Sequence, residues 1–159
     1  MICDDCQALY EEVGDLAREG RRFEKVRRTD DALRCRAKGV ESEAYYMAEV
    51  ADSHDVVWVG LYTPDRWLSE SIEADLMHQG DKIEELLEDE LYDQGFEARL
   101  PVEHFRDERK RYVFRSPVFL PKGEKLDGEG MIDRVHKVLM AYDATFSQLG
   151  DMKGGKKVV

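Results

Sequence analysis

Apolar residues recur at two different spacings along this chain, and the spacing separates the expected helices from the expected strands. Steps of three and four residues predict a helix that ends near Gly20 and another over 132–149, whose apolar stripe is unbroken. Alternation at every second residue predicts strands over 33–37, 44–50 and 56–63. A helical stretch over 64–94, divided near Gly80, precedes a hairpin formed by 97–105 and 110–116.

These elements predict an α+β fold with an antiparallel sheet and the order α-β-β-β-α-β-β-α. Residues 1–150 form one domain, and 151–159 are expected to be a disordered tail. The basic segment 21–28 is expected to be a further helical turn or a connector. Thr63, followed by Pro64, is the expected N-cap of the long helical stretch.

Two strands are apolar on both sides, which a sheet with one exposed face does not need. In one strand, Trp58 and Tyr62 point to one side and the apolar residues between them point to the other. In the second strand, Tyr112 and Phe114 point to one side and Val113 points to the other. We therefore expect more apolar sheet surface than three helices can cover, and a partner on the remaining face. The alternative is that the helices divide between the two faces and bury everything.

Pro117 interrupts the last predicted strand, because proline cannot donate a ladder hydrogen bond. We expect the ladder to end there, at an edge, so that Phe119 and its neighbours are free to contact a groove or a second subunit. The residues expected to bind a partner are Trp58, Tyr62, Tyr112, Phe114 and Phe119.

Charge narrows the classes of partner. The formal net charge of −11 argues against nucleic acid and against an anionic membrane surface, since both require a basic footprint. An acidic surface instead suits a polypeptide segment with apolar and basic residues. No run approaches the ~20 apolar residues of a membrane span, and no secretory leader is recognised, so a cytoplasmic location is expected.

The sequence carries no catalytic signature. Cys3 and Cys6 have CxxC spacing, but the two acids between them disfavour a redox thiolate, and a zinc site lacks an evident fourth ligand. The four histidines share no ligand spacing, and the chain has no phosphate-binding glycine motif. No cofactor and no metal is therefore expected.

The element order, length and acidic charge of roughly residues 3–150 resemble the type III secretion chaperone-like fold, which is shared by effector chaperones and by the YbjN family of bacterial proteins. That resemblance implies a cytoplasmic homodimer without enzymatic activity that holds an extended polypeptide segment. The long helical stretch 64–94 departs from a simple version of this pattern.

We therefore expect a non-enzymatic chaperone, adaptor or regulatory protein that acts as a homodimer and binds a protein or peptide. Two alternatives stay open. One is a small enzyme or ligand-binding domain with a site assembled around His104, Glu103 and Tyr112. The other is a metal- or redox-responsive regulator that uses Cys3, Cys6 and Cys35.

Overall fold

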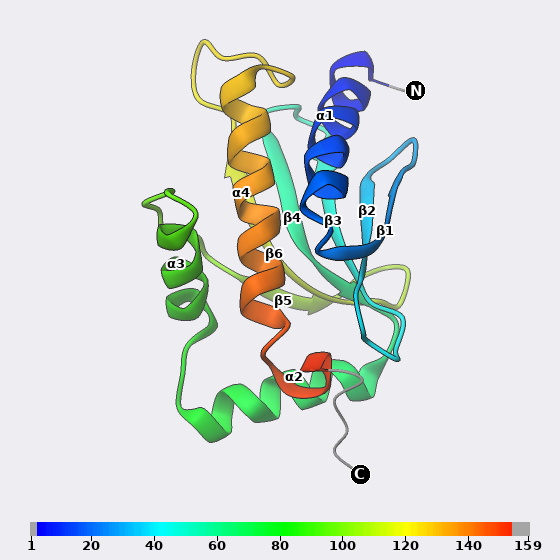
Figure 1. Cartoon of the computed structure of the whole chain (residues 1–159), viewed down its shortest axis with the longest axis vertical. Coiled ribbons are helices and arrows are strands. Elements are labelled where there is room, and N and C mark those ends of the chain that lie inside the picture. The colour runs from blue at the N-terminus through cyan, green and yellow to red at the C-terminus, as the bar shows by residue number, and fades with distance from the viewer. Residues whose placement is uncertain (1–2, 154–159) are drawn as a thin grey trace.

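A computed structural model describes residues 3–153 and confirms an α+β fold around an antiparallel sheet (Figure 1). The sheet has six strands in the order β1-β2-β3-β4-β6-β5, and every neighbouring pair is antiparallel. The strands are β1 (Phe23–Arg28), β2 (Leu33–Ala37), β3 (Tyr45–Val50), β4 (Val56–Thr63), β5 (Glu103–Arg106) and β6 (Tyr112–Phe119).

The described residues also form four α-helices: α1 (Asp4–Gly20), α2 (Arg66–Gln79), α3 (Ile83–Asp93) and α4 (Glu129–Phe146). Helices α1 and α4 lie side by side on one face, α1 over β1 and β2 and α4 over β3, β4 and β6 (Figure 1). Helix α3 packs against α4. The apolar stripe predicted for α4 is buried at Val135, Leu139 and Phe146, as the periodicity required.

Two predictions for local structure were wrong. Residues 23–28 form strand β1 and not a connector; the strand has buried Phe23 and half-buried Val26 as its only apolar side chains. The N-cap of α2 is Asp65 and not Thr63: its carboxylate accepts hydrogen bonds from the amides of Trp67 and Leu68. A carboxylate at this position also interacts favourably with the helix dipole.

Pro117 does not end the ladder, which corrects the sequence prediction. Strand β6 pairs with β4 through Phe119, whereas β5 covers only Tyr112–Arg115. Successive backbone amides of a strand point to opposite sides. The Leu120 amide points toward β4, because it donates to the Asp55 carbonyl (2.8 Å), and the Pro117 nitrogen, three residues earlier, therefore points to the outer edge. Proline is therefore tolerated at this position, because no described strand pairs with the outer edge of β6 there and no acceptor is left without a backbone N–H donor.

The C-terminal boundary lies later than predicted. Gly150–Lys153 form a short 3-10 helix, η1, which packs against α2 and buries Met152. The expected tail at 151–159 therefore starts too early, and its remaining residues 154–159 lie outside the described chain. None of the described helices has the length and apolar content that a bilayer crossing requires.

Candidate functional site

Within residues 3–153, helices α1 and α4 cover one face of the sheet, and the opposite face has no helix packed over it. Strand register assigns each side chain to a face, because successive residues point to opposite sides. The face away from α1 and α4, here called the open face, has a small apolar cluster formed by strand and turn residues alone: Ala32, Met47, Tyr62 and Val113, with Tyr45 and Phe105 packed against them.

Three of the five residues predicted to bind a partner lie on the open face. Tyr62 is buried in the small cluster, Trp58 is half-buried, and Phe119 is 64% exposed. The other two point to the helix side. Phe114 pairs with Leu61 and is buried beside α4, and Tyr112 pairs with Thr63. Trp58, Tyr62 and Phe119 thus lie on the face without helices, as expected, but Phe114 belongs to the core.

Arginines cover the aromatic rings of the open face. The Arg115 guanidinium lies 3.8 Å from the centre of the Trp58 ring and 4.8 Å from that of Phe105. Arg111 lies 4.9 Å from the Tyr62 ring. Each such cation–π contact contributes ~0.5–1 kcal/mol at an exposed site. The apolar surface that the sequence implied is therefore capped by cations and not by helices.

The cations concentrate at β1 and β2. A cavity of about 250 Å³, here called the basic hollow, is lined by Lys25, Arg27, Arg34, Arg36 and Tyr45. The Tyr45 ring lies 4.2 Å from the Arg34 guanidinium and 5.7 Å from that of Arg36. Among the described residues no carboxylate lines this hollow, although the whole chain has a net charge of −11.

The strand register brings like charges together in the basic hollow. Lys25 lies directly opposite Arg36, and Arg27 lies directly opposite Arg34. Opposed like charges destabilise a strand pair by roughly 0.2–1 kcal/mol each. The Arg34 Nε atom is also buried, and the described part of the chain gives it no hydrogen-bond partner. Lys25 and Arg27 are exposed to water, whereas Arg34 and Arg36 are half-buried beside Tyr45.

A second hollow, of about 420 Å³, continues the open face toward β5 and β6 and has mixed charge. Arg111 donates to Asp107 (2.8 Å), and Arg115 pairs with Glu103 (3.3 Å). Burial raises the pKa of Glu49 in this hollow, although nearby Arg111 and Arg115 act in the opposite direction. Cations and carboxylates here largely satisfy one another.

The alternative site around His104, Glu103 and Tyr112 does not assemble. Glu103 and His104 are neighbours on β5 and point to opposite faces, Glu103 toward Arg115 and His104 onto the ring of Phe114 (3.8 Å between ring centres). His104 instead contacts Ser69 and Glu73 of α2.

His104 joins strand β5 to helix α2. Its Nε2 atom lies 3.2 Å from Ser69 Oγ, and its Nδ1 atom lies 2.9 Å from Glu73 Oε1. This is the connectivity of a serine–histidine–acid triad. A nucleophile must reach its substrate, however, and Ser69 is only 2% exposed. Burial lowers the pKa of His104, opposed by Glu73, so we interpret the group as a structural clamp.

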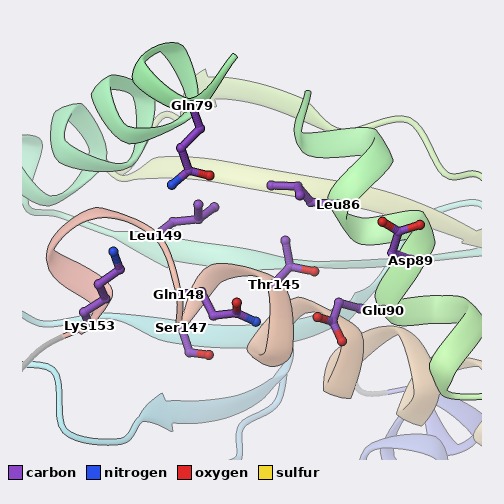
Figure 2. A pocket seen from close by; sticks show the side chains of 9 residues that line it. All are labelled: Gln79, Leu86, Asp89, Glu90, Thr145, Ser147, Gln148, Leu149 and Lys153. Carbon is purple, nitrogen blue, oxygen red and sulfur yellow. The ribbon is translucent and has the colours of Figure 1, made fainter. Parts of the chain in front are cut away.

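A cavity of about 610 Å³ lies between α2, α3, η1 and the end of α4 (Figure 2). The residues that line it come from these four elements and from the segment between α4 and η1: Gln79, Leu86, Asp89, Glu90, Thr145, Ser147, Gln148, Leu149 and Lys153. Thr145 Oγ1 is buried without a hydrogen-bond partner among the described residues. The described lining offers polar contacts, but no cysteine or histidine to act as nucleophile or base.

The three cysteines separate into two groups. Cys35 is buried in β2, and burial raises its pKa to about 12. Cys3 and Cys6 instead meet His54 at the turn between β3 and β4. Burial, followed by the neighbouring Cys3, raises the pKa of Cys6 to about 12. The sequence prediction was that no metal binds, and the alternative left open grouped Cys3 and Cys6 with Cys35; the structure joins them to His54 instead, which no spacing in the sequence indicates.

Comparison with known proteins gives no relative: no protein-family model, curated protein or solved structure matches this chain. The resemblance to the type III secretion chaperone-like fold and the YbjN family therefore stays a prediction, which rests on element order, length and charge and not on a sequence motif.

Proposed function

We propose that this protein is a non-enzymatic binding protein whose basic hollow holds an acidic segment of a partner polypeptide. The role agrees with the adaptor or chaperone function that the resemblance implies. It differs from the sequence expectation in the charge of the partner, because an acidic chain was expected to hold a basic segment.

The arrangement of charge in the basic hollow supports this proposal. Four cations from β1 and β2 face the same small cavity in two opposed pairs, a costly arrangement unless an anion neutralises it. Carboxylates fit this need, because guanidinium groups bind them through paired hydrogen bonds. Arg34 Nε is buried without a hydrogen-bond partner among the described residues, so it can donate to a ligand carboxylate once the side chain turns toward the hollow.

A protein partner fits this face better than a nucleic acid. Single-stranded nucleic acids bind by stacking their bases on free aromatic rings. Here arginines lie over the rings of Tyr45, Trp58 and Tyr62. The strongly negative remainder of the chain also repels a long polyanion, whereas a short acidic segment meets only the local cations.

Self-association is a separate part of the proposal. Phe119 is 64% exposed, and beyond Arg115 no described strand pairs with the outer edge of β6. Because Pro117 cannot donate toward that edge, a homodimer formed there would rely on side-chain contacts and not on a continuous ladder. Light scattering of the wild type and of Phe119→Asp tests this part: a monomeric wild type contradicts it.

The binding proposal is tested by fluorescence anisotropy with three labelled probes of equal length: a glutamate-rich peptide, a lysine-rich peptide and a single-stranded oligonucleotide. We expect the glutamate-rich peptide to bind with about micromolar affinity, near −8 kcal/mol. Affinity should fall as salt is raised, because partly exposed ion pairs are screened. Preference for the lysine-rich peptide or the oligonucleotide would overturn the proposal.

A matched pair of variants locates the binding. Loss of one charge-assisted hydrogen bond costs about 1.5–3 kcal/mol, so Arg34→Gln should weaken the acidic peptide roughly 10- to 100-fold. Arg66→Gln is the control, because Arg66 is an exposed arginine on α2 that pairs with Glu70. Equal losses in the two variants would show non-specific attraction and would count against the hollow.

A further inference from the structure

We propose that Cys3, Cys6 and His54 bind a transition-metal ion of the zinc class. One ligand atom from each of these residues lies within 4.8 Å of the other two. Two segments far apart in the sequence supply them, the start of α1 and the turn between β3 and β4. This inference does not depend on the proposed binding of an acidic segment.

The spacing of these atoms is close to what a tetrahedral zinc ion requires. With zinc–sulfur and zinc–nitrogen bonds of ~2.3 and ~2.0 Å, neighbouring ligand atoms stand roughly 3.6–3.8 Å apart. Cys3 Sγ and His54 Nδ1 are already 3.9 Å apart. The remaining contraction is less than ~1.5 Å for any pair of ligand atoms, a distance that side-chain rotation can supply.

The backbone at both ends of the cluster holds the ligands in place. Cys3 is the N-cap of α1, and its sulfur accepts a hydrogen bond from the Cys6 amide (3.3 Å), so both sulfurs lie on the first helical turn. His54 has a left-handed backbone with φ 63°, a conformation uncommon for residues other than glycine. This turn directs the imidazole toward the sulfurs.

The ligand types select the metal. Two thiolates and one imidazole suit zinc and other soft or borderline ions, and they do not suit calcium or magnesium, which require oxygen. Binding converts two thiols to thiolates, so two protons are released for each divalent ion that enters. Cys6 is buried, and Cys3 Sγ accepts from its amide, so a cation between the two sulfurs offsets the cost of burying thiolate charge.

The described protein residues supply three ligands, and His54 is exposed to solvent. His54 also lines a cavity of about 420 Å³, together with Asp5 and residues of the loop after β6. Three protein ligands with one position left for water or another ligand are typical of zinc sites that are not purely structural. We infer that water, or a small ligand from this cavity, completes the tetrahedron.

Cobalt(II) titration of the reduced, metal-free, full-length protein tests this site. We expect one equivalent to give a sulfur-to-cobalt charge-transfer band and the strong visible bands of tetrahedral cobalt, both abolished by zinc. Cys3→Ser and Cys6→Ser should lose the charge-transfer intensity in part. Cys35→Ala should keep it, because Cys35 is buried apart from the cluster.

His54→Asn is the decisive variant, since asparagine tolerates the left-handed backbone and removes only the imidazole. We expect it to weaken cobalt and zinc by at least about tenfold. The control His78→Asn, at an exposed histidine of α2, should leave affinity unchanged. Wild-type affinity in His54→Asn, or no cobalt spectrum in a wild type with three titratable thiols, would overturn the site.

Discussion

Gly60 lies at the centre of β4 on the open face, and Gly60→Ala should destabilise the fold strongly. A Cβ atom built at this position lies 2.7 Å from Arg115 Cβ and 2.8 Å from Arg115 Cα, and it overlaps the Phe114 carbonyl oxygen. Contacts under 3.0 Å require something to move. Here the obstacles are atoms of β6, which β4 and β5 hold on both sides.

The size of the effect follows from this geometry. Overpacking a core costs ~1–3 kcal/mol when side chains can adjust, and we expect about 3 kcal/mol because the backbone cannot. For a domain of this size, that loss lowers the melting temperature by roughly 6–12 °C. The variant should also displace Arg115 from the Trp58 ring, so the open face is altered as well as the stability.

Urea unfolding, followed by circular dichroism and tryptophan fluorescence, measures this effect. The control is Gly20→Ala at the last residue of α1, where an added Cβ has only an ordinary contact, 3.8 Å from Met140 Cε. The control should be neutral or more stable by up to ~1 kcal/mol. If Gly60→Ala came within ~0.5 kcal/mol of the wild type, the level of a neutral surface change, the register of β4 and β6 described here would be wrong.

Two further predictions concern buried polar groups. Burial lowers the pKa of His104, and nearby Glu73 opposes this effect. The folded protein therefore binds a proton at His104 less readily than the unfolded chain does. The stability that neutral His104 contributes is present above its ordinary pKa of 6.5 and is lost as the pH falls. The urea concentration at the unfolding midpoint should therefore decline as the pH is lowered from about 7.5 to about 5, and it should decline less steeply in His104→Gln than in the wild type. Equal slopes in the two proteins would contradict this prediction. The Tyr10 hydroxyl accepts from the Val50 amide (2.8 Å), so Tyr10→Phe should cost ~1–3 kcal/mol in urea unfolding. No change would show that water replaces the hydroxyl.

Periodicity predicted the long elements well, because their burial depends on local spacing. Helix α4 has an unbroken apolar stripe, and β4 alternates around large side chains. Strand β1 gave no such signal: it is an edge strand with Phe23 and Val26 as its only apolar residues, and its charged side chains read as a connector. Its partner β2 was predicted from clean alternation.

Strand register decides the faces, and a single sequence does not supply it. Tyr112 and Phe114 were grouped with Trp58 and Tyr62, yet the pairing of Phe114 with Leu61 places that ring in the core. The basic hollow was missed for the same reason. Its signal was present as alternating cations in 25–36, but it could be recognised only once β1 was known to pair with β2.

Charge reversal of the basic hollow tests the central claim most directly. The double variant Arg34→Glu, Arg36→Glu replaces two of the four cations that line the cavity. Fluorescence anisotropy should show the acidic peptide lost and the lysine-rich peptide newly bound, while the wild type shows the opposite preference. If the double variant still preferred the acidic peptide, the open face would not be the site at which this protein recognises its partner.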